Sequence, residues 1–185
     1  MLIDQIRAAT AADHKKLEER LFPFLQNIHS KEQYAQLLNA FYGYIYPVQE
    51  KIAQFIDRNV VTDMDQRRNA SLIEEDIHAL GLPMNGRLST HLPNIFNHPS
   101  ALGALYVLEG STLGGKIIAK TISDKLGTTE ALGFFRGYGP ETGPMWKKFT
   151  QFLDMPLNRQ SAETVVDTAT DTFRRFGTWF ENQLV

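Results

Sequence analysis

The chain has 185 residues, enough for one domain with a full core, and its 43% hydrophobic and 22% charged residues are ordinary for a folded, soluble protein. A formal net charge of −2 provides no strongly basic face for nucleic acid, and no apolar run approaches the roughly twenty residues of a membrane span. The lack of cysteine excludes disulfides, thiolate metal sites and cysteine nucleophiles. Since no secretory signal is recognisable, we expect one cytoplasmic domain over residues 1–185, with neither nucleic acid nor membrane as a partner.

Helical periodicity runs through the whole chain. Apolar residues at three- and four-residue steps predict a first helix over residues 2–21, ending before Pro23. Ser30 and Gln33 form a capping-box pattern at the start of a second long helix, which Pro47 should kink. A third helix is expected over residues 66–80 and is closed by Gly81. After a turn-rich stretch over 82–99, a fourth is expected over 100–126 and is ended by Gly127. The remaining helices are expected over residues 129–135, 143–153 and 161–185. Alternating strand patterns are absent, so the fold class is all-α.

One row of side chains on the first expected helix should face inward: Ile3, Ile6, Thr10, His14, Leu17 and Leu21. The titratable ring of His14 lies within this mostly apolar row. A buried imidazole must hydrogen-bond or bind something, because an unpaired polar group in an apolar place costs a few kcal/mol. Glu18, one turn later, can accept a hydrogen bond from the second ring nitrogen, as occurs behind metal-bound histidines. Arg7, two turns earlier, can pair with an anionic group of a ligand. A core histidine bonded to a backbone carbonyl is the open alternative.

Several glycines lower the intrinsic stability of the helix expected over residues 100–126. Each of them costs about 1 kcal/mol relative to alanine in a helix interior, so something should compensate. Gly103, Gly110 and Gly114 share one side of this helix, and Gly115 follows directly. Close packing of another helix is one explanation. The other is that bare backbone forms one wall of a pocket for a flat ligand, with the small Ser111 hydroxyl beside it.

Two basic pairs can supply a charge for a ligand carboxylate. Lys147 and Lys148 follow Trp146, and Arg174 with Arg175 lies in the last expected helix. Such pairs usually belong to a solvated helix face.

Two segments of the chain together resemble the heme oxygenase family. Arg7-Ala-Ala-Thr-Ala-Ala-Asp-His14-Lys-Lys-Leu-Glu18 is similar to its proximal-helix motif, with a basic residue two turns before a heme-ligating histidine and a glutamate one turn after it. Leu105-Tyr-Val-Leu-Glu-Gly-Ser-Thr-Leu-Gly-Gly115 resembles the distal helix of bacterial members. The length and the helical content also agree, so the resemblance covers nearly the whole chain.

The resemblance implies a single-domain bundle that holds heme between a proximal helix and a kinked distal helix. His14 would be the axial ligand of the heme iron, with Glu18 as its hydrogen-bond partner. Gly110, Gly114 and Gly115 would line the distal wall. Propionates would be paired by Arg7 and by Lys147 or Lys148, and the heme would be flanked by Phe173 and Phe176.

The implied activity is the oxidative opening of heme, as substrate and cofactor at once, to biliverdin, carbon monoxide and ferrous iron with molecular oxygen and external electrons. The implied partners are an electron donor of reductase, ferredoxin or flavodoxin type and a bilin-accepting protein. Ser111 stands where animal members of the family have an aspartate that anchors a proton-supplying water network. We therefore expect the proton relay to include Ser111 and other groups that the sequence does not name.

Two alternatives have a different chemistry. A non-catalytic heme carrier or sensor on the same scaffold shares the role of His14 but leaves heme intact. Thiamin-type pyrimidine hydrolysis occurs on a related helical fold with a cysteine nucleophile, which this chain lacks. A di-iron site at Glu75 and His78 would need a second Glu-x-x-His pair, and the sequence has none.

Overall fold

A computed structural model describes residues 1–183 of the chain, and its regular elements are all helical. In chain order they are α1 (Leu2–Gln26), α2 (Lys31–Phe55), the 3-10 turn η1 (Met64–Gln66), α3 (Ser71–Ala79), α4 (His98–Leu126), α5 (Gly133–Arg136), the 3-10 turn η2 (Gly139–Glu141), α6 (Thr142–Leu153) and α7 (Arg159–Gln183). The predicted all-α class is confirmed. The last two residues of the helix expected over 161–185 lie outside the described residues.

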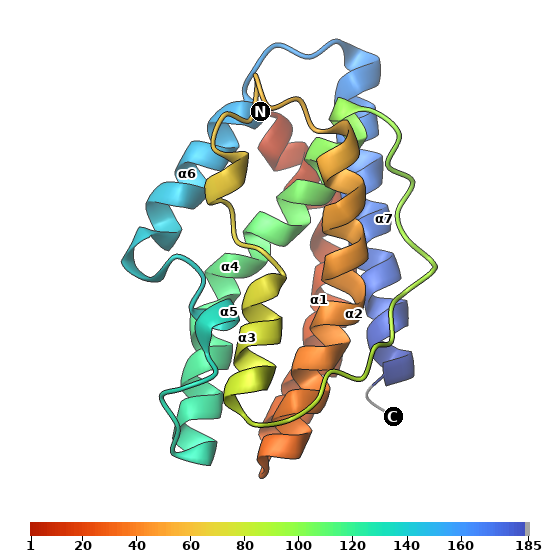
Figure 1. Cartoon of the computed structure of the whole chain (residues 1–185). Helices are drawn as coiled ribbons and strands as arrows, with labels where there is room; N and C mark the ends of the chain where they lie inside the picture. Colours follow the sequence, from red (N-terminus) through yellow and green to blue (C-terminus); the bar gives the residue numbers. More distant parts are fainter. Residues whose placement is uncertain (184–185) are drawn as a thin grey trace.

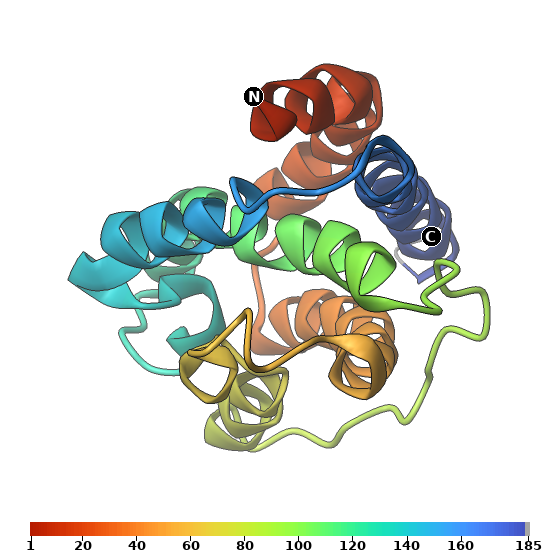
Figure 2. The ribbon, with the colours of Figure 1, turned by 90° about the horizontal axis from the view of Figure 1, so that it is seen from above.

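Helix α4 occupies the middle of the molecule. Seen from above, it lies between α1 and α7 on one side and α2 and α3 on the other, with α6 alongside it (Figure 2). Its N-terminal half runs diagonally and its C-terminal half descends more steeply, so the helix changes direction near its middle (Figure 1). The segment from α3 to α4 passes around the outside of α2 (Figures 1 and 2). The remaining helices therefore enclose α4, and its residues reach the core from several directions.

Helix α1 continues past the end expected from the sequence. It runs to Gln26 with Pro23 inside it, so the prediction that the helix stops before the proline was wrong. The extra turn is retained because Leu25 and Ile28 are buried in the core, each with 1% of its surface exposed. Tertiary packing thus outweighs the loss of one backbone hydrogen bond at the proline.

Helix α2 begins as the sequence predicts. The Ser30 hydroxyl accepts the Gln33 backbone N–H at 3.2 Å, and the Gln33 side chain accepts the His29 N–H at 2.7 Å. The helix passes through Pro47 without ending. Gly43 has no room for a side chain, since a Cβ there would lie 2.5 Å from both the Arg87 carbonyl oxygen and the Trp179 ring. This glycine lets the α3–α4 segment and α7 pack closely on α2.

The third helix is shorter than predicted. It starts at Ser71 instead of Gln66, and residue 67 adopts an extended backbone with φ −75° and ψ 148°. The Asn69 side chain accepts the Ser71 N–H at 2.9 Å, which favours a start at that point. The early start was wrong because Arg67 and Arg68 turn into the protein, where they bind partners on other elements.

Helix α4 has strong end signals. Asn97 and Ser100 form a reciprocal capping box, Pro99 occupies the first turn, and Gly127 ends the helix with φ 63°. The expected start at Ser100 was two residues late. Helix α5 begins four residues later than the expected 129, because residues 128–132 form a turn in which Ala131 has φ 57°.

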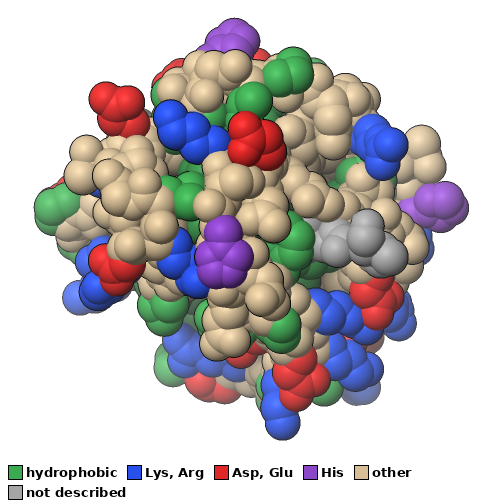
Figure 3. All heavy atoms as spheres, turned by 90° about the horizontal axis from the view of Figure 1, so that it is seen from below, with side chains coloured by type: hydrophobic (Ala, Val, Ile, Leu, Met, Phe, Trp, Pro, Cys, Tyr) green, Lys and Arg blue, Asp and Glu red, His purple; other side chains and the backbone are tan. Residues whose placement is uncertain are grey.

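The face of the molecule seen from below carries no dominant charge (Figure 3). Lysine, arginine and acidic side chains are interspersed on the face shown in Figure 3. Within residues 1–183, no helix is both long and apolar enough to cross a membrane.

Candidate functional site

A cavity of about 420 Å³ opens between α1 and α4 and reaches inward to α5, α6 and α7. Its walls are mostly apolar and aromatic, with rings contributed by five different helices besides α1: Phe41, Tyr106, Phe134, Phe135, Trp146, Phe173 and Phe176. Only a few polar side chains face it. A concave apolar site with a few convergent polar groups is the usual form of a small-molecule or cofactor pocket.

His14 lies on the α1 wall of this cavity. Its side chain is 53% exposed, so the expectation that the ring is buried was wrong. The ring packs edge-on against Phe173 of α7 at a centroid distance of 5.3 Å. Glu18 also lines the cavity, and its Oε1 is 3.7 Å from the His14 Nε2, beyond hydrogen-bonding distance. The expected hydrogen bond is thus not formed, although the two groups are adjacent on one face of α1.

Arg7 lies two turns before His14 on the same wall of the cavity. Tyr106 of α4 lines the same cavity and is close enough for the Arg7 charge to act on it. Burial raises the pKa of the Tyr106 phenol, and the Arg7 charge opposes that rise. Arg7 is exposed and lines an apolar cavity, so its guanidinium can pair with an anionic group of a ligand.

Helix α4 presents bare backbone to the cavity at two of the predicted glycines, Gly110 and Gly114. A Cβ built on Gly114 would meet no heavy atom within 4 Å, and one on Gly110 would meet only the Trp146 ring at 3.7 Å. Both residues line the cavity, and Ser111 lies between them.

Gly103 and Gly115 serve a different purpose. A Cβ on Gly103 would lie 2.3 Å from the Val165 carbonyl oxygen of α7, and one on Gly115 would lie 2.2 Å from the Phe135 carbonyl oxygen. Close helix packing is therefore the correct explanation for these two. Gly115 points at α5 and does not line the cavity, which contradicts its predicted place on the distal wall.

Arg68 is a cavity residue that the sequence analysis missed. It projects from the segment before α3, and its guanidinium donates to the Ser111 hydroxyl, to the Leu108 carbonyl at 3.0 Å and to the Phe134 carbonyl at 3.2 Å. The charge also lies 4.0 Å above the centre of the Phe134 ring. Burial lowers the pKa of Arg68 to about 10, which leaves it positively charged at neutral pH.

Ser111 in turn donates to the Leu108 carbonyl at 2.7 Å. The predicted small hydroxyl beside the glycine wall is present, and its partner is the Arg68 guanidinium. No sequence pattern identified this arginine, because residues 66–80 read as one helix and an arginine pair on a helix normally faces solvent.

The predicted basic pairs lie elsewhere. Lys147 and Lys148 are exposed on α6 and do not line the cavity, and the Lys148 ammonium is 3.1 Å from an Asp63 carboxylate oxygen. Arg174 and Arg175 bind Asp171 at 2.9 and 2.7 Å. The expectation that Lys147 or Lys148 pairs with propionates is therefore not supported by their position. In residues 1–183, His, Cys, Asp and Glu side chains form no group of three that could hold a metal ion, so Glu75 and His78 lack further ligands.

Comparison with known proteins identifies the family. The model of the family described as heme oxygenase matches residues 85–182, more than half of the chain. This chain belongs to the heme oxygenase family. A curated protein described as heme oxygenase from Xanthomonas campestris pv. campestris (strain 8004) is 27% identical to it over 132 residues, which cover 71% of this chain and 78% of the relative.

Solved structures agree with this heme oxygenase in fold. Heme oxygenase from Leptospira interrogans has a TM-score of 0.76 at 18% identity, covering 98% of both chains. The NO- and CO-bound heme oxygenase from Neisseria meningitidis has a TM-score of 0.77 at 18% identity, covering 100% of this chain and 92% of its own. Heme oxygenase-1 from the cyanobacterium Synechocystis sp. PCC6803, in complex with heme, has a TM-score of 0.76 at 18% identity, covering 98% and 91%. The chain is thus an enzyme, a heme-degrading oxygenase with an all-α fold.

Proposed function

We propose that the cavity between α1 and α4 binds heme with the His14 imidazole as axial iron ligand, and that the enzyme opens this heme to biliverdin, carbon monoxide and ferrous iron. Molecular oxygen and electrons from an external donor are the other reactants. One observation carries the proposal: the His14 ring and the bare backbone of Gly110 and Gly114 line the same cavity from opposite helices.

The residues present fit a heme. Aromatic and aliphatic side chains match the apolar faces of a macrocycle, and a neutral imidazole is a common axial ligand that pushes less electron density to the iron than a thiolate does. A side chain at position 110 or 114 would extend into the space that the second face of the ring needs. Phe173 and Phe176 would flank the macrocycle from α7.

Charge determines how the heme is oriented. Arg7 is the cationic side chain at the α1 rim of the cavity, and we assign it to a propionate. The large apolar side chains of Phe22, Leu113 and Ile117 line the cavity as well, although 39%, 47% and 59% of their surfaces are exposed. They provide apolar contacts for the parts of the ring that carry no charge.

Arg68 and Ser111 supply the polar groups on the α4 side. The bound heme contributes an iron that activates oxygen and a ring that is itself oxidised. Around it, the Arg68 guanidinium holds a fixed positive charge that stabilises negative charge on that side of the pocket. We assign the transfer of a proton to the Ser111 Oγ, which accepts from Arg68 and donates to the Leu108 carbonyl.

The test is a hemin titration followed by turnover with ascorbate or a reductase in air. Wild type should bind one equivalent with a sharp Soret band and produce a green linear tetrapyrrole. His14→Ala should weaken or shift that band, and His78→Ala, which alters an exposed histidine on α3, should leave it unchanged. A heme complex whose spectrum stays constant for hours under these conditions would instead identify a heme carrier. An unaltered Soret band in His14→Ala would refute the ligand assignment.

A further inference from the structure

A buried ionic cluster lies behind the α4 wall, outside the cavity. It consists of Asp63, Arg67, Glu109 and Tyr138. Arg67 donates to Asp63 at 2.6 and 3.0 Å and to Glu109 at 2.8 Å. The side chains of these three charged residues are only 1–2% exposed. Nothing in the proposed function uses this cluster directly.

Lys148, outside the cluster, balances its charge. Two carboxylates face Arg67 and Lys148, whose ammonium is 3.1 Å from Asp63. Replacing buried ion pairs by apolar groups of similar volume is often neutral or stabilising, so such a cluster is weak evidence for stability. Its better-supported use is to fix one arrangement of the groups attached to it.

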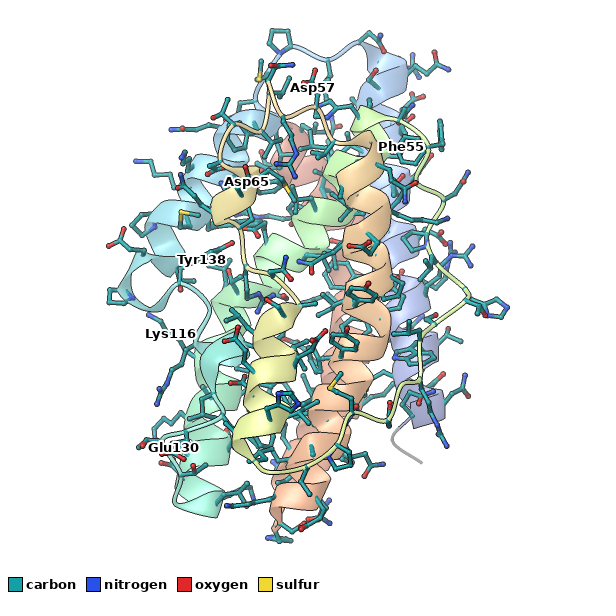
Figure 4. All side chains as sticks on the ribbon, in the orientation of Figure 1. Phe55, Asp57, Asp65, Lys116, Glu130 and Tyr138 are labelled. Carbon is teal, nitrogen blue, oxygen red and sulfur yellow. The ribbon has the colours of Figure 1, made fainter. Side chains whose placement is uncertain are left out.

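The backbone N–H of Arg68 forms a hydrogen bond with a member of this cluster. Residue 67 is extended, so the side chains of Arg67 and Arg68 point in opposite directions, one into the cluster and one to the cavity. Tyr138, in the segment between α5 and α6 (Figure 4), accepts the Arg68 N–H at 2.7 Å. The same phenol donates to the Glu109 carboxylate at 2.9 and 3.0 Å.

The phenol keeps its proton in this setting. Burial raises the pKa of Tyr138, and the negative charge of Glu109 raises it further. Glu109 directly precedes Gly110, so one carboxylate connects the glycine wall of α4 with the backbone of Arg68.

We propose that Tyr138, Glu109 and Arg67 are positioning residues, which hold the Arg68 guanidinium at the distance from the glycine wall that the reaction requires. The inference rests on the proposed heme site, since Arg68 has a role only if a ligand occupies the cavity opposite His14.

Tyr138→Phe is the test because it removes one oxygen atom and both of its hydrogen bonds. We expect hemin affinity and KM within twofold of wild type. The kcat and the affinity of the ferric heme complex for azide, an anion that Arg68 would stabilise, should each fall about fivefold, since one such hydrogen bond is worth about 1 kcal/mol. Tyr42→Phe is the matched control, because Tyr42 of α2 donates to the Glu74 carboxylate of α3 and neither residue lines the cavity.

A double-variant cycle separates positioning from general damage. In an Arg68→Leu background, Tyr138→Phe should cause no further loss of azide affinity, because no guanidinium remains to be positioned. Should Tyr138→Phe fail to fold, Glu109→Gln takes its place with the same expected pattern. Unchanged azide affinity and kcat, or an equal loss with and without Arg68, would overturn the inference. Failure of wild type to bind or degrade hemin would instead refute the proposed function itself.

Discussion

Replacing the glycines of α4 one at a time separates the cavity wall from the packing contacts. Gly114→Ala introduces a Cβ that meets no heavy atom within 4 Å. Alanine is favoured over glycine in a helix interior by about 1 kcal/mol, so the free energy of unfolding of the protein without heme should rise by about that amount. At this chain length, 1 kcal/mol corresponds to a rise in Tm of roughly 2–4 °C.

Gly103→Ala and Gly115→Ala should have the opposite effect. Their Cβ atoms would lie 2.3 and 2.2 Å from backbone carbonyl oxygens, so α7 or α5 must move. Overpacking of this kind costs about 1–3 kcal/mol. After the gain of about 1 kcal/mol in helix propensity, a net loss of up to about 2 kcal/mol is expected.

Gly114→Leu connects this series to function. Leucine is also a good helix former, so the variant without heme should be at least as stable as wild type, while its side chain fills space beside the glycine wall. Urea unfolding without heme, hemin titration and turnover are measured on the same four variants. The wall assignment requires a stable Gly114→Leu that has lost hemin binding or turnover. Full binding and turnover in that variant would refute it, and a destabilised Gly114→Ala would show that the space beside Gly114 is not open.

Two further predictions concern stability. Asp171→Asn should destabilise the protein at neutral pH by less than about 1 kcal/mol, since the side chains of its partners Arg174 and Arg175 are 63% and 37% exposed. Burial acts to raise the pKa of Asp171, but hydrogen bonds from Arg174 and Arg175 outweigh it and the net pKa is lowered. The stabilisation is therefore present above the ordinary carboxyl pKa and should disappear as the pH falls from about 4 downward; a difference in urea midpoint that stayed constant from pH 7 to pH 3 would contradict this. Ala131→Gly should raise the unfolding free energy by about 1 kcal/mol, because φ of 57° is unfavourable for alanine, and thermal unfolding measures it; an unchanged or lower Tm would count against strain at this turn.

The helical elements could be predicted because their local signals are strong. The capping box at Ser30 and the left-handed glycine after Leu126 are physical features of short segments, and the structure contains both. The errors are at Pro23 and at Arg67–Arg68, where contacts with distant parts of the chain decide the conformation. Propensity and periodicity contain no information about such contacts.

The glycine face of α4 shows the same limit in the candidate site. Gly103, Gly110 and Gly114 share one side of the helix, yet α7 packs on the first and the cavity adjoins the other two. Helical periodicity places a residue on a face, but the point where a second helix crosses that face depends on the whole fold. The sequence therefore predicted a glycine-rich face of this helix correctly. It could not predict which of these glycines contact another helix and which line the cavity.

From Thr10 onward, the helix stripe that contains His14 faces a cavity. This stripe was interpreted as the buried side of a helix, and its members Thr10, His14, Leu17 and Leu21 do all face inward, but they face the cavity. Thr10 and Leu21 are buried there, whereas the imidazole is half-exposed. The Thr10 hydroxyl donates to its own helix at the Ile6 carbonyl at 2.8 Å, while the His14 Nε2 lies 3.7 Å from the Glu18 Oε1, too far for a hydrogen bond. A polar side chain in an apolar stripe can thus find a partner in two ways, through a hydrogen bond within its own helix or through a ligand in a cavity. The ring's position on the cavity wall favours the second for His14.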